Sequence, residues 1–265
     1  MLFCPIASGS KGNCFYVEGG GARVLVDAGL TAKEITRRLA SIDVMPNMLD
    51  AILVTHEHID HVSAVPLLSR RHKLDVIGSE GTLKAPSRVG KLLENAFRAR
   101  ELSSGETMSI AGMRITSFSV PHDAAAPVGY RFSADGITLT VASDLGTVTR
   151  LIRASFEGSD AMIIESNHDP EMLLRGPYSW ELKQRIRSKH GHLSNIECSE
   201  FLAQVNHPGL QHVVLAHLSE VNNMPHLAFE SAQSVFASQQ NACGLTVAPQ
   251  HEVGTFVTLF NGGGG

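Results

Sequence analysis

The composition lacks the features that would by themselves indicate a membrane protein or a nucleic-acid-binding protein. Its 22 lysine and arginine residues are outnumbered by 26 aspartate and glutamate residues, so no general basic surplus indicates a nucleic-acid partner. No apolar run approaches the length of a membrane span, and the first residues lack the basic and apolar segments of a signal peptide. We therefore expect a chain without a membrane partner.

Cysteine is also scarce. The four cysteines are Cys4, Cys14, Cys198 and Cys243, and they are not spaced as the paired ligands of a zinc motif. Unpaired, mostly packed thiols are typical of proteins from reducing compartments. We therefore predict a cytoplasmic location.

An internal linker and low-complexity segments are missing too. The 265 residues, 43% of them hydrophobic, suffice for one sizeable core. We predict a single domain over residues 1–261, followed by a flexible glycine tail, residues 262–265. Strand-like and helix-like runs alternate along the chain and include predicted helices over residues 81–100, with Pro86 at a start or kink, and over residues 180–189.

Histidine, by contrast, is abundant, and three of the thirteen histidines lie in Thr55–His61. This stretch follows a short apolar run and precedes a helix-like one. At a strand end His56 and His58 would point to one side, and a turn into a helix near Asp60 would direct Asp60 and His61 toward a second point. Such imidazole and carboxylate ligands suit zinc, manganese or iron. A solvated polar turn with coincidental histidines is the alternative.

Further candidate ligands follow other predicted strands. The strand-end side chains are His56, His58, His122, Asp144, His168 and His217. We expect one ion to be held by His56, His58 and His122. A second ion would be held by Asp60, His61 and His217. Asp144 would lie between the two ions. Two cations would ionise a bridging water near neutral pH, which makes that hydroxide the expected nucleophile.

The order of these residues resembles the metallo-β-lactamase superfamily. An aspartate after an early strand, Asp27, precedes the H-x-H-x-D-H motif, and His122, Asp144 and His217 follow in order. The resemblance covers nearly the whole chain and implies an α/β fold, a four-layer αββα sandwich of two mixed sheets with helices on the outer faces. We expect Asp27 to orient the metal-binding turn and Asp123 to hold an imidazole.

A narrower resemblance is to the YycJ/WalJ-type branch, described as DNA 5′-to-3′ exonucleases related to RNase J and RNase Z. The segments that carry it are Ser8–Asn13, Thr55–His61, Glu165–Asp169, Gly191–Asn195 and His217–Ser219. The segment Gly191–Ser194 is similar to the G-H-x-S segment of β-CASP nucleases, whose histidine contacts the scissile phosphate. This implies the same role for His192. The interval from Asp144 to His217 leaves no room for an inserted β-CASP domain.

These resemblances and the glycine-rich loop at residues 8–13 name candidate residues for substrate and catalysis. The residues expected to bind a substrate phosphate are Ser10, Asn13, His168, His192 and Ser194. The residues expected to take part in catalysis are Asp60, Asp144 and His192. An ordinary loop at residues 8–13 and a turn role for His168 are the alternatives. The basic segment 183–189 is either a solvated helix face or a contact to the phosphate backbone.

The favoured hypothesis is a hydrolase with two divalent metal ions, zinc or manganese and less readily iron, that cleaves DNA as a 5′-to-3′ exonuclease. A small-molecule hydrolase on the same scaffold, such as a thioesterase, lactonase or β-lactamase, is the alternative. A third hypothesis is a binding or redox protein without hydrolytic activity. A monomer and a dimer are both compatible with the sequence.

Overall fold

Two sheets of seven strands each form the centre of the computed structural model, which describes residues 1–261. The first sheet has the strand order β14 (Val257–Thr258), β1 (Leu2–Ala7), β2 (Cys14–Gly19), β3 (Ala22–Val26), β4 (Ala51–Leu53), β5 (Asp75–Gly78) and β6 (Arg98–Glu101). The second sheet has the order β13 (Gly244–Val247), β12 (His212–Ala216), β11 (Ala161–Glu165), β10 (Ile137–Ala142), β9 (Val128–Ala134), β8 (Met113–Ser119) and β7 (Thr107–Ile110). The predicted glycine tail, residues 262–265, lies outside the described residues.

Both sheets are mixed. In the first, β1, β2 and β3 pair antiparallel and β3 to β6 pair parallel; in the second, β7 to β10 pair antiparallel and β10 to β13 pair parallel. Parallel strands need crossover connections, which the helices supply. The carboxyl ends of the parallel strands β3, β4, β10, β11 and β12 all carry candidate site residues, as expected for an open sheet of this kind.

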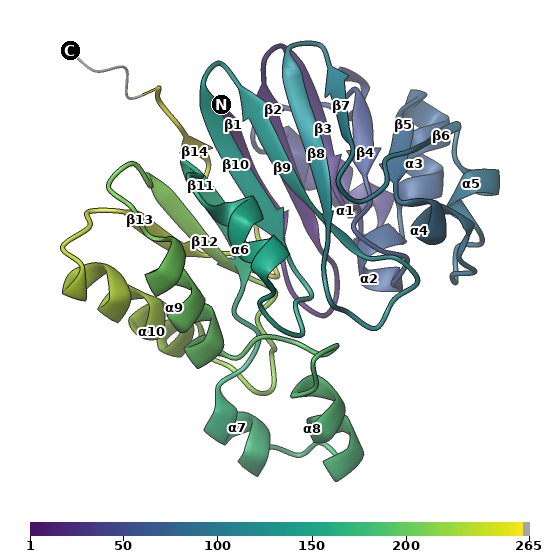
Figure 1. Cartoon of the computed structure of the whole chain (residues 1–265). Coiled ribbons are helices and arrows are strands. Elements are labelled where there is room, and N and C mark those ends of the chain that lie inside the picture. Colours follow the sequence, from purple (N-terminus) through teal and green to yellow (C-terminus); the bar gives the residue numbers. More distant parts are fainter. Residues whose placement is uncertain (262–265) are drawn as a thin grey trace.

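Helices cover the outer faces of both sheets (Figure 1). The first half contains α1 (Ala32–Ala40), the 3-10 helix η1 (Pro46–Met48), α2 (Ile59–Val62), α3 (Val65–His72), α4 (Glu80–Lys84) and α5 (Leu92–Asn95). The second half contains α6 (Arg150–Phe156), α7 (Pro170–Arg175), α8 (Trp180–Ile186), α9 (Asn195–Val205) and α10 (Pro225–Ser238). Among residues 1–261, no helix has the length and apolar character needed to cross a membrane.

Three buried clusters hold these layers together. One lies between the sheets and includes Phe3, Tyr130 and Phe132. A second packs the first sheet against its helices through residues such as Ile35 and Leu68, and a third packs the second sheet against α6, α9 and α10. Burial of these side chains supplies the main driving force for the stacked layers. The predicted four-layer αββα sandwich is therefore confirmed.

The helix predicted over residues 81–100 is wrong in extent. The chain forms α4, breaks before Pro86, forms the one-turn helix α5 and then enters the edge strand β6. Pro86 disfavours a helical conformation at the residue before it, Ala85, which is extended in the structure. The helix predicted over residues 180–189 ends earlier, at Ile186.

Candidate metal centre

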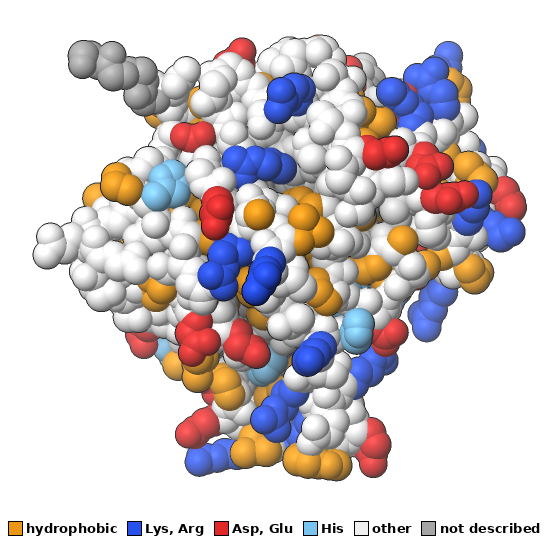
Figure 2. Space-filling model, viewed as in Figure 1, with side chains coloured by type: hydrophobic (Ala, Val, Ile, Leu, Met, Phe, Trp, Pro, Cys, Tyr) orange, Lys and Arg blue, Asp and Glu red, His pale blue; other side chains and the backbone are white. Residues whose placement is uncertain are grey.

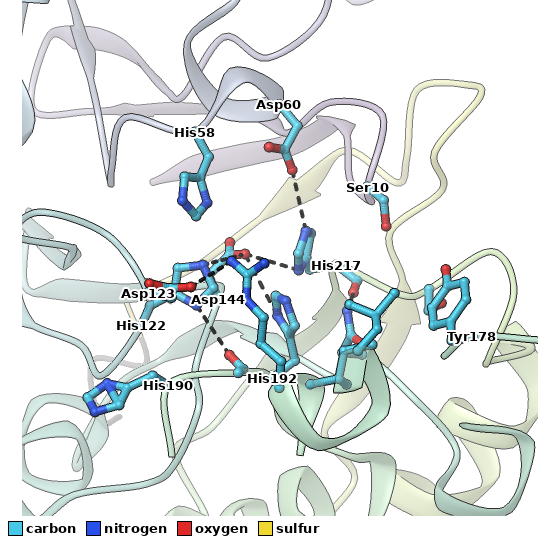
Figure 3. Close-up of a pocket in the computed structure, with 16 residues that line it drawn as sticks. Ser10, His58, Asp60, His122, Asp123, Asp144, Tyr178, His190, His192 and His217 are labelled. Carbon is cyan, nitrogen blue, oxygen red and sulfur yellow. Dashed lines mark hydrogen bonds and ion pairs between the residues drawn. The ribbon is translucent and has the colours of Figure 1, made fainter. Parts of the chain in front are cut away.

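Buried histidine and carboxylate side chains meet where the parallel strands of the two sheets end. They line a cavity of about 360 Å³ whose polar wall is shown in Figure 3. The candidate ligands and catalytic groups on this wall are His58, Asp60, His122, Asp144, His192 and His217. The candidate ligands His56 and His61 lie behind this wall and are almost fully buried.

The strand-to-helix turn has the predicted geometry. After β4 the chain extends through His56 to His58, which precedes α2 with φ −62° and ψ 147°. The first turn of α2 then holds Asp60 and His61, and the N–H of His61 donates to the carbonyl of His58 at 2.9 Å. The turn therefore presents its side chains in two directions, as the spacing indicated.

Asp27 anchors this turn. Its carboxylate accepts hydrogen bonds from the backbone N–H and the hydroxyl of Thr55, both at 2.8 Å, and from Nδ1 of His61 at 2.8 Å. Because Nδ1 of His61 donates to Asp27, Nε2 is left as an acceptor directed toward Asp144, 3.2 Å away. The expected role of Asp27 in orienting the turn agrees with these contacts.

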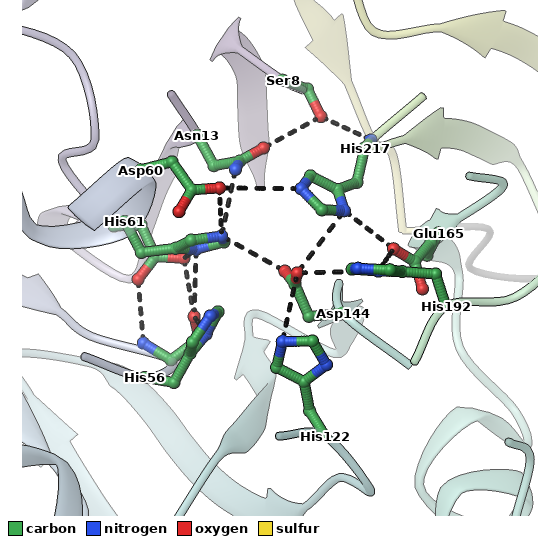
Figure 4. A network of polar contacts seen from close by, with 12 residues as sticks. Ser8, Asn13, His56, Asp60, His61, His122, Asp144, Glu165, His192 and His217 are labelled. Carbon is green, nitrogen blue, oxygen red and sulfur yellow. Dashed lines mark hydrogen bonds and ion pairs between the residues drawn. The ribbon is translucent and has the colours of Figure 1, made fainter. Parts of the chain in front are cut away.

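The candidate ligand atoms form four overlapping groups, and two of these have the composition that the sequence predicts. The other two join Asp144 with His56 and His61, and Asp144 and Glu165 with His192 and His217. Of the predicted groups, one is His56, His58 and His122, and the other is Asp60, His61 and His217; within each group the candidate ligand atoms lie within 4.8 Å of one another. Asp144 lies between them, with its oxygens 3.7 Å from Nε2 of His122 and 3.2 Å from Nε2 of His61 (Figure 4). One carboxylate therefore reaches both groups.

These groups suit divalent cations. Nε2 of His56 and Nε2 of His217 are buried and have no hydrogen-bond partner among the described residues. Buried polar atoms are normally paired, so two imidazole nitrogens directed into one acidic cluster fit metal ligands. Burial would raise the pKa of Asp144, but His217 and His61 hold that pKa well below its usual range. Imidazole nitrogens together with carboxylate oxygens form a donor set that zinc and manganese accept.

Glu165 holds two of the histidines with one oxygen. Its Oε1 lies 2.8 Å from Nδ1 of His192 and 2.7 Å from Nδ1 of His217, while Oε2 accepts from the backbone N–H groups of Leu145 and Leu193. Burial alone would raise the pKa of Glu165, but the two histidines outweigh it and lower the pKa to about 2. The sequence analysis gave Glu165 no role of its own; a carboxylate ending a buried strand was the available signal.

Only part of the expected phosphate-binding set reaches the cavity. Ser10 and His192 line it. Asn13, His168 and Ser194 do not line the cavity, and their contact with a phosphate stays a prediction. The amide of Asn13 is buried and donates to the carbonyl of Gly9 at 3.2 Å, and it lies 3.0 Å from Nε2 of His61. This amide therefore braces the glycine-rich loop.

The hydroxyl of Ser194 is engaged in hydrogen bonds of its own helix, and the side chain of His168 is buried. The hydroxyl of Ser194 accepts from the N–H of Glu197 and donates to its carboxylate, which forms the capping box of α9. His168 is 3% exposed, and burial lowers its pKa to about 4. Neither side chain belongs to the cavity wall.

Asp123 differs from expectation as well. Its carboxylate pairs with the guanidinium of Arg185 at 2.6 Å and is 57% exposed, so it does not hold an imidazole. Nδ1 of His122 donates instead to the carbonyl of Gly191 at 3.2 Å. The chain bends at residues 122–126, where the N–H of Ala124 donates to the carbonyl of His122, and Asp123 faces Arg185.

Three residues of the site have a left-handed backbone. Asp27, Asp144 and His217 have φ values of 61°, 57° and 55°. Each directly follows a parallel strand, or lies two residues beyond one, where the chain turns away from the sheet. Such a conformation is unfavourable for residues other than glycine and is concentrated at functional sites.

Comparison with known proteins finds one matching family, related sequences and solved structures of the same fold. Residues 22–218 match a family model described as the beta-lactamase superfamily domain. The chain is 41% identical to exodeoxyribonuclease WalJ of Streptococcus pneumoniae, over 91% of this chain and 90% of that protein. It is 37% identical to exodeoxyribonuclease YycJ of Bacillus anthracis, over 89% of each. A crystal structure of zinc-bound PqqB from Methylobacterium extorquens superposes with a TM-score of 0.70 at 19% identity, covering 98% of this chain and all of that one.

Proposed function

Because this chain belongs to the β-lactamase superfamily, and within it to the branch of the exodeoxyribonucleases WalJ and YycJ, we propose that it is a metal-dependent nuclease that degrades DNA from the 5′ end. The observation that carries the proposal is a set of seven candidate ligands, five of them buried, beside the partly exposed His192. His192 is 21% exposed at the cavity wall, whereas Asp144 and His217 behind it are buried.

The ligand set is proposed to hold two divalent cations, zinc or manganese. The ligands would be His56, His58, Asp60, His61, His122, Asp144 and His217. When bound, such a pair supplies a water ionised near neutral pH and positive charge beside the phosphoryl oxygens. Asp144 reaches both groups, so it fixes their separation, and Asp60 and Asp144 keep the cluster anionic.

His192 is proposed to act on the substrate directly. Glu165 binds Nδ1 of His192, which leaves Nε2 free to bind a phosphoryl oxygen or to give a proton to the leaving oxygen. Because Glu165 is itself fixed by two backbone N–H groups, His192 cannot rotate away without breaking a buried hydrogen bond.

Three further expectations belong to this proposal. We propose that residues 1–261 act as one domain, because a single buried cluster is shared by both sheets. The four free cysteines support a reducing, cytoplasmic location. DNA is the proposed partner, and the oligomeric state is open between monomer and dimer.

The test uses DNA duplexes carrying a label at either the 5′ or the 3′ end and beginning with a 5′-phosphate or a 5′-hydroxyl. Purified protein is incubated with manganese or zinc, beside a thioester substrate. We expect labelled mononucleotides from the 5′ end, and His58→Ala should abolish their release whereas His226→Ala, at an exposed histidine, should not. Turnover of the thioester without any nucleotide release would show that the proposal is wrong.

A further inference from the structure

The segment between β11 and α9 stands apart from the layers. Figure 1 shows α7 and α8 projecting below the body of the molecule, where neither helix covers a sheet. None of the seven described residues of α8 is buried, and in α7 only Leu173 is. Yet Trp180, the single tryptophan of the chain, is 58% exposed here, and Leu174 is 55% exposed. Apolar side chains gathered on an exposed helix pair indicate a binding surface.

This surface is basic, although the chain as a whole is acidic. Residues 177–190 contain four lysine or arginine residues, Lys183, Arg185, Arg187 and Lys189, and one acidic residue, Glu181. Figure 2 shows blue and orange side chains together at the lower end of the molecule, where Figure 1 places α7 and α8. A local positive charge beside aromatic side chains complements a polynucleotide strand rather than an acidic or purely apolar partner.

One face of this segment lines the cavity of the candidate metal centre. The cavity that contains His192 is also lined by Tyr178, Leu182, Arg185 and Ile186, which we name the α8 platform. Leu182, Arg185 and Ile186 stand at positions i, i+3 and i+4 of α8, so they lie on the same side of that helix. Tyr178 is half-buried and precedes the helix, so its ring lies at the edge of the same cavity.

Arg185 is held loosely at the mouth of this cavity. Its guanidinium pairs with Asp123 at 2.6 Å, but the two side chains are 63% and 57% exposed. An exposed ion pair contributes little to stability, so a phosphate group can compete for the guanidinium. Arg185 is thus available to a substrate that enters between α8 and the loop containing Asp123.

We propose that the α8 platform binds an unpaired nucleotide next to the scissile phosphate, with the base stacked on Tyr178 against Leu182 and an adjacent phosphate on Arg185. This inference rests on the proposed function and adds how the strand is held. The cavity volume of about 360 Å³ lies in the range of sites for small ligands, about 300–1,000 Å³, so it admits one strand rather than two paired strands. A duplex end must therefore unpair at least one nucleotide to be cut.

Stacking is tested by removing one base at a time from the strand. Oligonucleotides with phosphorothioate linkages, which slow cleavage, carry an abasic residue at each of the first positions from the 5′ end. They are titrated into the metal-loaded full chain, and Trp180 fluorescence reports binding because no other tryptophan is present. We expect one abasic position to weaken binding about fivefold or more, and Tyr178→Ala to weaken the intact strand similarly.

The decisive measurement combines both changes. In Tyr178→Ala the sensitive abasic position should cost nothing further, whereas Tyr178→Phe should bind as the wild type does. If Tyr178→Ala fails to fold, the abasic scan in the wild type and in Tyr178→Phe still decides. Equal binding of all abasic strands, or undiminished sensitivity in Tyr178→Ala, would overturn the platform.

Arg185→Ala is compared with Arg37→Ala, because both arginines are 63% exposed and ion-paired, and Arg37 lies on α1 outside the cavity. Only Arg185→Ala should weaken binding and reduce its salt dependence. Binding with these dependences but without cleavage of any DNA would leave the platform intact and refute the nuclease. Cleavage of DNA without any effect of Tyr178→Ala or Arg185→Ala on strand binding would leave the nuclease intact and refute the platform.

Discussion

At the metal centre His56, His61 and Asp144 are at most 2% exposed, whereas none of the described residues of α8, which lines the same cavity, is buried. The first region lies at the ends of strands shared by three packed clusters, and the second depends on Leu173 and a few surface contacts. Catalytic geometry needs side chains fixed by their surroundings, while strand entry needs a part that can move. The difference assigns chemistry to the sheets and recognition to α7 and α8.

The largest effect that would sharpen this comparison is expected from Asp144→Ala. Asp144 reaches both ligand groups, so its loss should lower the nuclease rate on the order of a thousandfold or more and reduce the bound metal. Metal content by elemental analysis and the cleavage rate are measured together. Asp135→Ala, at an exposed turn with φ 55°, is the matched control and should change neither. Full metal occupancy and activity in Asp144→Ala would contradict the assignment.

Glu165→Gln is expected to act next in size. The amide cannot accept from His192 and His217 through one oxygen and also from two backbone N–H groups without losing a bond. Loss of such an orienting group typically costs about 10–100-fold in metal affinity or activity. Metal affinity and cleavage rate are compared with Glu171→Gln, whose carboxylate is 77% exposed. Unchanged metal affinity and rate would show that the buried carboxylate does not orient either histidine.

Leu173→Ala tests whether the two regions are separable. It removes the one buried side chain of α7, and a large-to-small change in a packed site costs about 2–5 kcal/mol. We expect faster hydrogen exchange over residues 170–190 and weaker strand binding, with metal content unchanged. Leu174→Ala, at a side chain 55% exposed in the same helix, is the control. A parallel loss of metal would break the comparison, because the metal centre would then depend on α7.

The smallest effect is expected from Asp123→Asn. It breaks the exposed ion pair with Arg185, so the free energy of unfolding should change by less than about 1 kcal/mol. Strand affinity should rise slightly, since Arg185 is then free for a phosphate. Denaturant unfolding and the Trp180 titration measure both quantities. A large loss of stability would mean that this pair holds α8 in place.

The sequence predicted the metal centre better than the surface that serves it. The candidate ligands follow strand ends, where residue type, spacing and strand direction are all visible in the chain. The structure places the two predicted ligand groups and Asp27 close together, and their binding of metal stays a prediction. The contact of Glu165 with His192 and His217 joins the ends of β11 and β12 with the loop between α8 and α9, and it depends on the tertiary arrangement, which no local pattern contains. Tyr178 and Leu182 belong to a short exposed segment without periodic burial, so no pattern predicted that they line the cavity. For Arg185 the basic segment 183–189 left a solvated helix face and a phosphate contact both open.

The misplaced predictions have local causes. Asn13 and Ser194 carry the polar groups that a phosphate would need, but the same groups satisfy the backbone of their own loop and helix. The helix expected over residues 81–100 has helix-forming residues, but the extended backbone before Pro86 and the pairing of β6 with β5 override that preference.

The left-handed backbone at Asp27, Asp144 and His217 has a consequence for engineering. A residue other than glycine in this conformation costs roughly 1 kcal/mol, so the three positions together oppose folding. A search for heat-resistant variants would therefore favour glycine at Asp144, whose Oδ2 has no hydrogen-bond partner among the described residues, and would select proteins that fold well and lack a central ligand. At Asp27 the three buried hydrogen bonds oppose the same change. Thermal screening of this protein should be paired with a screen for retained metal.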